Sequence, residues 1–219
     1  MIKYGPKLVT SGLEIVFDAA NSRSYSGTGT NWHDLSGKGN DGTITGGLSF
    51  SYSNYGIIGL TGSGYVVLND YTGITSSMTV FAVVYPTSMI TAGFGTDAIC
   101  SMKGILWQIN TDGYDYWADV SVGPIGIIIP GGFSNNTWYS IALSQNNQDV
   151  RAYKNGIFKV GATAVNINVA SYSKNIASYQ NANRQFRGNI GAVYVYNRAL
   201  TDDEIMTNHT AVRSRFNLP

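Results

Sequence analysis

Carboxylates are the side chains that catalyse hydrolysis of glycosidic bonds, and this chain has few in a suitable arrangement. Glycosidases need two carboxyl groups that flank the bond to be cleaved. The sequence contains two glutamates, Glu14 and Glu204, far apart in the chain, and its densest aspartate cluster is Asp112, Asp115 and Asp119. Aspartates alone could do acid–base chemistry, so glycoside hydrolysis stays an alternative. The pattern favours a protein that is not an enzyme, and we predict no catalytic residue.

Nucleophilic catalysis has no better support in the sequence. The chain holds two histidines, His33 and His209, and no Gly-x-Ser-x-Gly motif. His209 lies on the docking face of a predicted helix, where a packed histidine is expected. The single cysteine, Cys100, is close to Ile99 and Met102 in an apolar strand, which indicates a small core residue. One cysteine also excludes an intrachain disulfide.

Loops rich in Asp, Asn and Gly raise two ligand hypotheses. Residues 37–42 match the dinucleotide-binding pattern G-x-G-x-x-G, but β-like residues 43–45 follow where that site requires a helix, so we predict a turn. Calcium is the second hypothesis, because Asp34, Asn40 and Asp41 share this loop and the aspartate cluster above supplies further oxygens. The same residue types also form turns. We therefore predict no metal site and no cofactor, with calcium as the alternative.

The segment 105–120 contains the residues that we expect to bind carbohydrate. A hairpin with residues 111–113 as its loop pairs Asn110 with Tyr114 and places Trp107 opposite Trp117. One face then carries apolar residues, and the other presents a polar and aromatic surface of the kind that stacks on sugar rings. A two-residue turn at Asp112-Gly113 would shift the pairing by one residue, and ordinary surface tyrosines are a further alternative. The predicted carbohydrate contacts are Gln108, Asp112, Tyr114 and Tyr116.

Composition limits the classes of partner. The chain has 219 residues, of which 12% are charged, and a formal net charge of +1. Because no basic stripe is present, we do not expect nucleic-acid binding. No apolar run approaches the roughly 20 residues of a membrane span, so we expect no membrane insertion. The first residues lack the apolar core and cleavage site of a signal peptide, which predicts synthesis in the cytoplasm without an export signal.

Alternation of apolar and polar residues predicts many short strands. In the first strand, Leu13, Ile15 and Phe17 are expected to share one face. The run 78–85 is apolar on both faces, which predicts a central strand covered on both sides.

Later segments give a clear hairpin and a long final strand. Asn155-Gly156 supplies the two positive φ angles of a type I′ turn, so segments 150–154 and 157–160 are predicted to pair. The final strand is expected over 186–197. Its predicted common face carries Ile190, Ala192, Tyr194 and Tyr196.

One helix is predicted, near residues 201–213. Thr201 and Glu204 match a capping box, in which each side chain satisfies a backbone N–H at the other's position. Leu200 and Ile205 occupy the two positions of a hydrophobic staple, which fixes how the preceding strand enters the helix.

The pattern as a whole predicts an all-β fold. Short strands at intervals of roughly 8–12 residues with one terminal helix indicate a two-sheet antiparallel jelly-roll sandwich with a short C-terminal helix. No composition break, linker or repeat divides the chain. We predict a single domain over residues 13–219 and an N-terminal arm over residues 1–12.

Four blocks of the sequence resemble the laminin-G-like, concanavalin A-like jelly rolls common in tailed-phage virion proteins. The first block, 12–47, has an Asp-Ala-x-Asn turn, a Gly-Thr-x-Trp step and an Asp-Leu-Ser-Gly-x-Gly-Asn loop. The others are 78–86, 137–158 and 186–205 with 208–216, so the resemblance covers about residues 11–217. The first and last blocks are fairly specific, and the middle blocks suit any lectin-like sandwich.

This resemblance implies a two-sheet fold and a role in carbohydrate or surface recognition, without fixing one function. We expect a non-enzymatic protein of the phage virion surface, made in the host cytoplasm: a capsid decoration protein, a head fibre or a tail-associated adhesin. The expected partners are other virion proteins and further copies of the chain, with host or environmental glycans as ligands. A stand-alone carbohydrate-binding module is the alternative.

Overall fold

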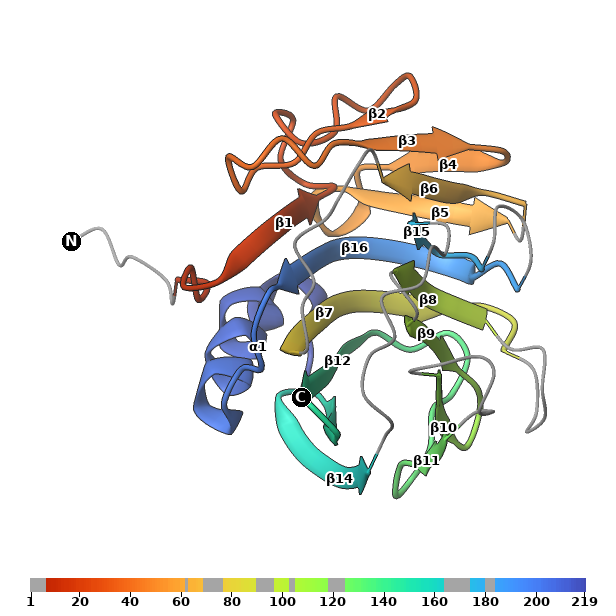
Figure 1. Cartoon of the computed structure of the whole chain (residues 1–219). Helices are drawn as coiled ribbons and strands as arrows, with labels where there is room; N and C mark the ends of the chain where they lie inside the picture. Colours follow the sequence, from red (N-terminus) through yellow and green to blue (C-terminus); the bar gives the residue numbers. More distant parts are fainter. Residues whose placement is uncertain are drawn as a thin grey trace.

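The computed structural model describes residues 7–61, 63–68, 77–89, 97–102, 105–117, 125–163, 174–179 and 184–219. Two antiparallel β-sheets pack face to face, and one helix, α1 (Asp202–Phe216), covers the outer face of one of them (Figure 1). The predicted fold class, a two-sheet jelly-roll sandwich with a short C-terminal helix, is confirmed. Within the described ranges no helix has the length and apolar character needed to cross a membrane.

The first sheet carries the helix on its outer face. In spatial order its strands are β14 (Ile157–Thr163), β13 (Asp149–Lys154), β12 (Tyr139–Asn146), β7 (Ser77–Pro86), β16 (Arg187–Tyr196), β5 (Ile57–Thr61) and β4 (Leu48–Ser51), and β1 (Leu13–Asp18) pairs with β16. A short 3-10 turn, η1 (Ser53–Tyr55), joins β4 to β5.

The second sheet closes the other side of the core. Its order is β11 (Ile125–Ile128), β10 (Gly113–Trp117), β9 (Ile105–Ile109), β8 (Asp97–Met102), β15 (Asn175–Ile176), β6 (Tyr65–Leu68), β3 (Gly42–Thr45) and β2 (Asn31–Trp32). The edge strands β11 and β14 contact each other, so the two sheets meet at one corner of the sandwich.

Strand β7 is buried on both faces, as the sequence predicts. Val80, Ala82 and Val84 lie in the core between the sheets, whereas Phe81 and Val83 pack in the cluster under α1. Alternate residues of a strand point to opposite faces, so in a strand covered on both sides neither face is exposed to solvent. The prediction of a central strand here is confirmed.

The predicted common face of β16 is wrong at one residue. The register of β16 against β7 shifts between Ile190 and Ala192, with Gly191 as the extra residue of a bulge. Ile190 therefore lies in the core between the sheets, and the other three residues lie on the outer face. A Cβ on Gly191 would come within 2.2 Å of the Phe216 ring, so glycine lets α1 pack this closely.

A second irregularity corrects the first strand. The register of β1 against β16 shifts between Leu13 and Ile15. Ile15 and Phe17 lie in the core between the sheets as predicted, but Leu13 packs against the outer cluster. The single apolar alternation predicted over this strand is therefore wrong at its first residue.

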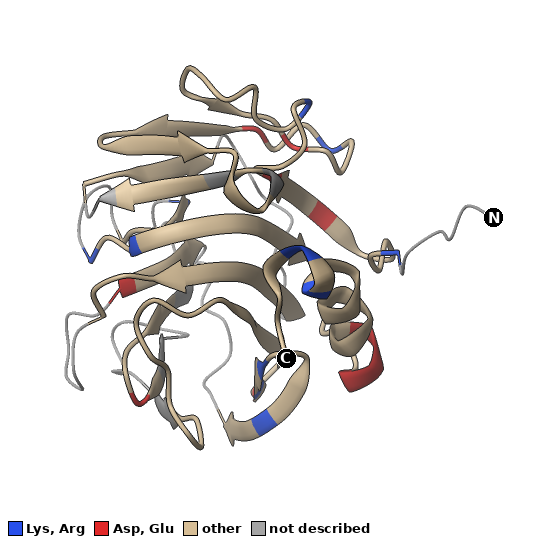
Figure 2. Cartoon of the chain, turned by 180° about the vertical axis from the view of Figure 1, so that it is seen from behind, with Lys and Arg blue, Asp and Glu red and all other residues tan. Residues whose placement is uncertain are grey.

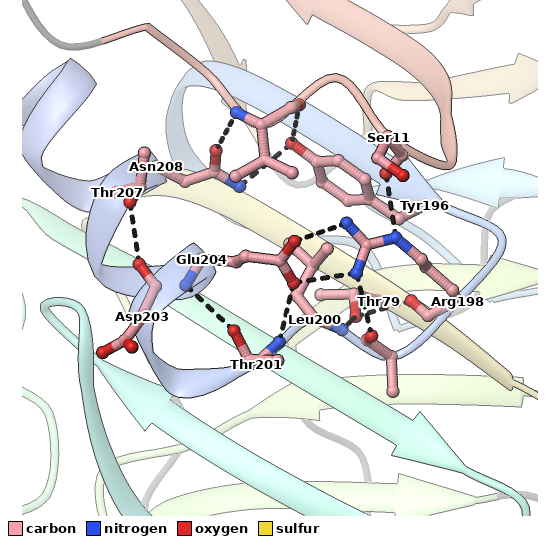
Figure 3. A network of polar contacts seen from close by, with 12 residues as sticks. Ser11, Thr79, Tyr196, Arg198, Leu200, Thr201, Asp203, Glu204, Thr207 and Asn208 are labelled. Atoms are coloured by element: carbon pink, nitrogen blue, oxygen red, sulfur yellow. Dashed lines mark hydrogen bonds and ion pairs between the residues drawn. The ribbon is translucent and has the colours of Figure 1, made fainter.

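Helix α1 begins where the capping box predicts. The Thr201 hydroxyl accepts from the Glu204 backbone N–H at 3.3 Å, and the Glu204 carboxylate accepts from the Thr201 N–H at 3.0 Å (Figure 3). Leu200 and Ile205 are both buried in the outer cluster, as a staple requires. The helix continues to Phe216, three residues past the predicted end.

The described part of the predicted arm, residues 7–12, is bound to the sandwich. The Val9 N–H donates to Asn208 Oδ1 at 2.9 Å, and the Tyr196 hydroxyl donates to the Val9 carbonyl at 3.0 Å (Figure 3). Arg198 Nε donates to the Ser11 carbonyl at 3.0 Å. The division into an arm and a domain stays a prediction, and this segment is anchored through side chains of β16 and α1.

Candidate functional site

The turn between β9 and β10 is shaped by one asparagine side chain. Asn110 Oδ1 accepts from the backbone N–H groups of Asp112 and Gly113, each at 2.9 Å. The Asn110 N–H donates to the Gly113 carbonyl at 3.0 Å, which makes Thr111 and Asp112 the two central turn residues. Both predicted loops, 111–113 and 112–113, are therefore wrong by one residue. The hydrogen bonds of the Asn110 side chain fix the position of the turn, and the pattern of apolar residues does not predict such bonds.

The corrected register separates the four predicted carbohydrate contacts. Gln108 pairs with Asp115 rather than with a tyrosine. Gln108 is 1% exposed and its Oε1 accepts from Arg184 Nη1 at 3.0 Å, so its predicted place on the surface is wrong. Tyr114 and Tyr116 belong to β10, but their side chains lie outside the described residues, and the aromatic surface stays a prediction.

Asp112 is exposed and lies in the wall of a shallow hollow, here called the Asp112 hollow. The loop after β11 lies directly beside residues 111–112 and completes the wall: the Ile129 N–H donates to the Asp112 carbonyl at 3.0 Å, and the Phe133 N–H donates to the Thr111 carbonyl at 2.8 Å. The volume is about 410 Å³, within the range of roughly 300–1,000 Å³ typical of small-ligand sites. Its lining residues are Thr111, Asp112, Ile128, Ile129, Gly131 and Gly132.

The wall of this hollow combines polar side chains, an exposed isoleucine and two glycines that have no side chain. The Asp112 carboxylate lies 3.4 Å from the Thr111 hydroxyl, and Ile128 is 75% exposed. A Cβ on Gly132 would meet the Thr111 carbonyl at 2.3 Å, so this close approach requires glycine. Gly131 has a φ of +77°, and a Cβ there would meet nothing within 4 Å. Asp112 and Thr111 can therefore accept hydrogen bonds from hydroxyl groups of a ligand, and Ile128 can contact a small apolar patch of the same ligand.

A second hollow, the lysine hollow, lies on the other side of the same loop. Lys154 Nζ donates to the Gly132 carbonyl and lies 5.0 Å and 5.1 Å from the ring centroids of Phe133 and Tyr139. Burial lowers the pKa of Lys154, and the charge of Lys159 lowers it further. The volume is about 200 Å³, and the described lining residues are Pro130, Lys154, Asn155, Ile157, Lys159 and Pro219.

A predicted turn positions both lysines. Asn155 and Gly156 have φ angles of 53° and 75°, and Lys154 pairs with Ile157, which confirms the hairpin between β13 and β14. A Cβ on Gly156 would come within 2.8 Å of His209, so the turn also packs against α1. Ile128 of β11 lines the first hollow, and Ile157 and Lys159 of β14 line the second, so both hollows lie where β14 approaches β11. Figure 1 shows these two strands.

Of the candidates for nucleophilic catalysis, His209 and Cys100 are buried, whereas His33 is exposed with Nδ1 at 3.0 Å from Asp41 Oδ2. His209 is 3% exposed, with Nδ1 at 2.8 Å from Ser140 Oγ and Nε2 at 3.0 Å from the Pro219 carbonyl, and burial lowers its pKa. Cys100 is fully buried, and burial raises the pKa of its thiol to about 12. The predictions that His209 is packed and that Cys100 is a core residue are confirmed.

The Asp34 loop is a hydrogen-bonded turn, as predicted. Asp34 Oδ1 accepts from the backbone N–H groups of Val16 and Ser36, each at 2.8 Å, and its Oδ2 accepts from that of Asn40 at 3.1 Å. Asp41 Oδ1 accepts from the Asp34 N–H at 2.8 Å. Strand β3 follows directly, as the turn hypothesis requires.

The second part of the calcium hypothesis falls largely outside the described structure. Asp119 and the side chain of Asp115 lie outside the described residues. Within the described ranges, no group of three or more His, Cys, Asp or Glu side chains is placed to hold a metal ion.

The fold recurs in solved carbohydrate- and receptor-binding proteins. Domain 4 of AbnA, an extracellular GH43 arabinanase from Geobacillus stearothermophilus solved with arabinotriose, is 18% identical, with a TM-score of 0.67 over 92% of this chain and 98% of that chain. The binding domain of Paraclostridial Mosquitocidal Protein 1 is 18% identical, with a TM-score of 0.65 over 90% of this chain. Botulinum neurotoxin type C, whose cell entry depends on two ganglioside molecules, is 11% identical with a TM-score of 0.69 over 93% of this chain. This chain spans 52% of each of those two toxin chains.

The sequence comparisons identify the family. No curated protein sequence matches the chain. Residues 60–206, which are more than half of the chain, match the family model described as the concanavalin A-like lectin/glucanases superfamily. Together with the two-sheet fold, this match shows that the chain belongs to the concanavalin A-like lectin/glucanases superfamily.

Proposed function

We propose that the chain is a non-catalytic carbohydrate-binding protein and that the Asp112 hollow holds the saccharide. The observation that carries the proposal is the composition of the hollow: an exposed carboxylate and a hydroxyl face a glycine-lined wall with an exposed isoleucine. Sugar hydroxyls donate well to an ionised carboxylate, and the apolar face of a sugar ring can cover an aliphatic side chain. A shallow, open site of this kind suits recognition of a polysaccharide.

The similar structures support the ligand class. The arabinanase domain was solved with arabinotriose, and entry of the type C neurotoxin depends on gangliosides. The arabinanase domain matches this chain over 98% of its own length, and we transfer only its class of ligand, a saccharide, to this chain.

The environment of the acidic residues supports binding without catalysis. A glycosidase needs a general acid whose pKa is raised, so that it is protonated near neutral pH. Arg198 instead holds the pKa of Glu204 down to about 2. Asp97 is 1% exposed and paired with Arg187, with Oδ1 at 3.1 Å from Nε. Neither carboxylate is suited to donate a proton to a leaving group.

We further propose that the chain works on the surface of a tailed-phage virion, as a decoration protein, head fibre or tail-associated adhesin. The four sequence blocks over residues 12–216 support this setting. Its partners are then other virion proteins and further copies of the chain. Detection of the protein in purified virions, together with oligomers in sedimentation, tests the setting. A strictly monomeric protein that no virion contains would refute it.

The binding site is tested by removing the Asp112 carboxylate. The purified chain is screened on a broad glycan array, and each hit is titrated by calorimetry against wild type and Asp112→Ala. A hydrogen bond to a charged group contributes about 1.5–3 kcal/mol, so we expect a loss of affinity of about tenfold or more. Asp149→Ala, an exposed aspartate at another hairpin, is the matched control and should bind as wild type does.

Each outcome of this experiment is informative. Equal binding by both variants would move the site away from the hollow, and a double Tyr114→Ala, Tyr116→Ala variant then tests the predicted aromatic surface. Absence of binding to every glycan would refute the proposed function. Release of reducing sugar from a bound polysaccharide would refute the non-catalytic assignment.

A further inference from the structure

We infer that the saccharide bound at this corner is acidic, with its anionic group in the lysine hollow and the hydroxyls of a neighbouring sugar at Asp112. The inference rests on the proposed carbohydrate-binding function and names the ligand class of that site. Four observations carry it: the two basic side chains of the lysine hollow, the way the Lys154 ammonium group is held, the scarcity of charge elsewhere, and the loop that the two hollows share as a wall.

Two basic side chains line the lysine hollow. Among its described lining residues are two lysines, Lys154 and Lys159, and no acidic side chain. In the described part of the chain, Lys159 has no ion-pair partner. Two cations around one small space repel each other unless an anion lies between them.

The first of these cations is held in a fixed position. Lys154 Nζ donates one hydrogen to the Gly132 carbonyl and lies over the rings of Phe133 and Tyr139. An ammonium group has three hydrogens to donate, so it can bind a further acceptor. The pKa of Lys154 is lowered by burial and then by Lys159, and a bound anion would relieve the second of these effects. The hollow therefore combines a positioned, partly desolvated cation, Lys154, with a second half-buried cation, Lys159.

This concentration of charge is unusual for the chain. Only 12% of residues are charged and the net charge is +1. Figure 2 shows charged residues thinly spread over the fold, with basic residues beside the C-terminal end of the chain. Two lysines that face the same space are therefore not explained by a generally basic surface.

The two hollows are separated by one loop, residues 128–132, which forms a wall of each. Residues 128, 129, 131 and 132 line the Asp112 hollow, and Pro130 lines the lysine hollow. The contact from Lys154 to the Gly132 carbonyl ties the two walls together. A saccharide that crosses Pro130 would place an acidic sugar unit at the lysines and a hydroxyl-bearing unit at Asp112. The negative charge of Asp112 would repel an anionic group at its own end of the site.

The test compares matched acidic and neutral polysaccharides. Affinity electrophoresis and calorimetry are run with polygalacturonate against its methyl ester, with hyaluronate against its carboxyl-reduced form, with chondroitin sulfate, and with neutral linear arabinan and dextran. We expect at least one acidic polysaccharide to bind tenfold or more tightly than its neutral counterpart. Preference for chondroitin sulfate over both carboxylated polysaccharides would assign the anionic group as sulfate.

Variants assign this preference to the lysine hollow. Lys159→Gln should lower affinity for the acidic polysaccharide about tenfold and leave binding of neutral polysaccharide unchanged. Lys154→Gln should do the same, and its thermal unfolding shows whether the half-buried position tolerates the change. Lys38→Gln removes the same charge from a remote exposed loop and should have no effect.

The possible failures are distinguishable. Equal binding of acidic and neutral forms, binding of neutral polysaccharides alone, or a preference that Lys159→Gln leaves intact would overturn the inference while the proposed carbohydrate binding stands. Absence of binding to every polysaccharide would overturn the proposed function, and the inference with it.

Discussion

Replacement of Glu204 by glutamine should remove a pH-dependent part of the stability of this fold. The Glu204 carboxylate accepts from Arg198 Nη2 at 2.6 Å, from Arg198 Nη1 at 2.8 Å and from the Thr201 N–H at 3.0 Å (Figure 3). These contacts, the Arg198 hydrogen bonds above all, lower the pKa of Glu204 from 4.5 to about 2. Because the folded-state pKa is the lower one, the stabilisation is present above about pH 4.5 and is lost as the pH falls towards 2.

The expected loss of unfolding free energy follows from the lowered pKa of Glu204 and from the exposure of the Arg198 and Glu204 side chains to water. A tenfold change in proton affinity is worth about 1.4 kcal/mol, which sets an upper limit of about 3 kcal/mol. The Arg198 and Glu204 side chains are 30% and 29% exposed, so water screens the pair. We therefore expect Glu204→Gln to lower the free energy of unfolding by about 1.5 kcal/mol at pH 7. For a domain of this size that corresponds to about 3–6 °C in Tm.

The assay is urea unfolding, followed by tryptophan fluorescence, of wild type and Glu204→Gln at several pH values between 7 and 2.5. The difference between the two proteins should shrink to a few tenths of a kcal/mol at about pH 2.5, where most of the stabilisation is lost. Asp203→Asn is the control, because it removes a charge from the same first turn of α1 but not from the Arg198 pair. A difference that is equally large at both ends of the pH range would refute the reasoning, since the loss would then not depend on the charge of Glu204.

Two further substitutions or modifications test how the fold is held together. Arg215 donates to Asp18 Oδ1 and to the carbonyls of Asn54, Gly56 and Gly191, and a lysine cannot reproduce this fork. Arg215→Lys should therefore cost about 2–3 kcal/mol in urea unfolding, and a loss below about 0.5 kcal/mol would contradict that role. Cys100 is buried and its thiol has a pKa of about 12, so a thiol reagent at pH 8 should label it only as fast as the protein unfolds, with a rate that rises with urea. Complete labelling within minutes in native buffer would show that the thiol is accessible.

Features that depend on neighbours in the sequence were predictable from the sequence. Thr201 and Glu204 form the capping box that their spacing predicts, and Asn155-Gly156 adopts the two positive φ angles of its turn. Strand β7 is buried on both faces because its apolar run leaves no polar side to expose. Each of these features is stabilised by contacts within a few residues or by burial of a whole segment, so composition and spacing carry the information.

The irregularities of the strands needed tertiary structure. The bulge at Gly191 moves Ile190 to the opposite face from the one predicted, because one extra residue interrupts the alternation. The Phe216 ring of α1 occupies the space that a side chain at residue 191 would fill, so this position requires glycine. Asn110 sets the β9–β10 register through its own side chain, so Gln108 pairs with Asp115 instead of a tyrosine. Gln108 is also buried and accepts from Arg184, which excludes it from the predicted contact surface. An alternating pattern shows which residues are apolar but not where one extra residue interrupts the pairing.

The candidate site likewise contains one part that was predictable from the sequence and one that was not. Asp112 was predictable as an exposed turn residue beside aromatic strands. The predicted Asn155-Gly156 hairpin brings Lys154 and Lys159 close together, but the hollow that they line was not predictable, because it forms only where the β14 edge of one sheet reaches Pro130 beyond the β11 edge of the other. By itself, the sequence determined a lectin-like sandwich and its local turns. Which side chains share a hollow was decided by long-range packing of the two sheets, because residues distant in the chain become neighbours only through the core that both sheets bury.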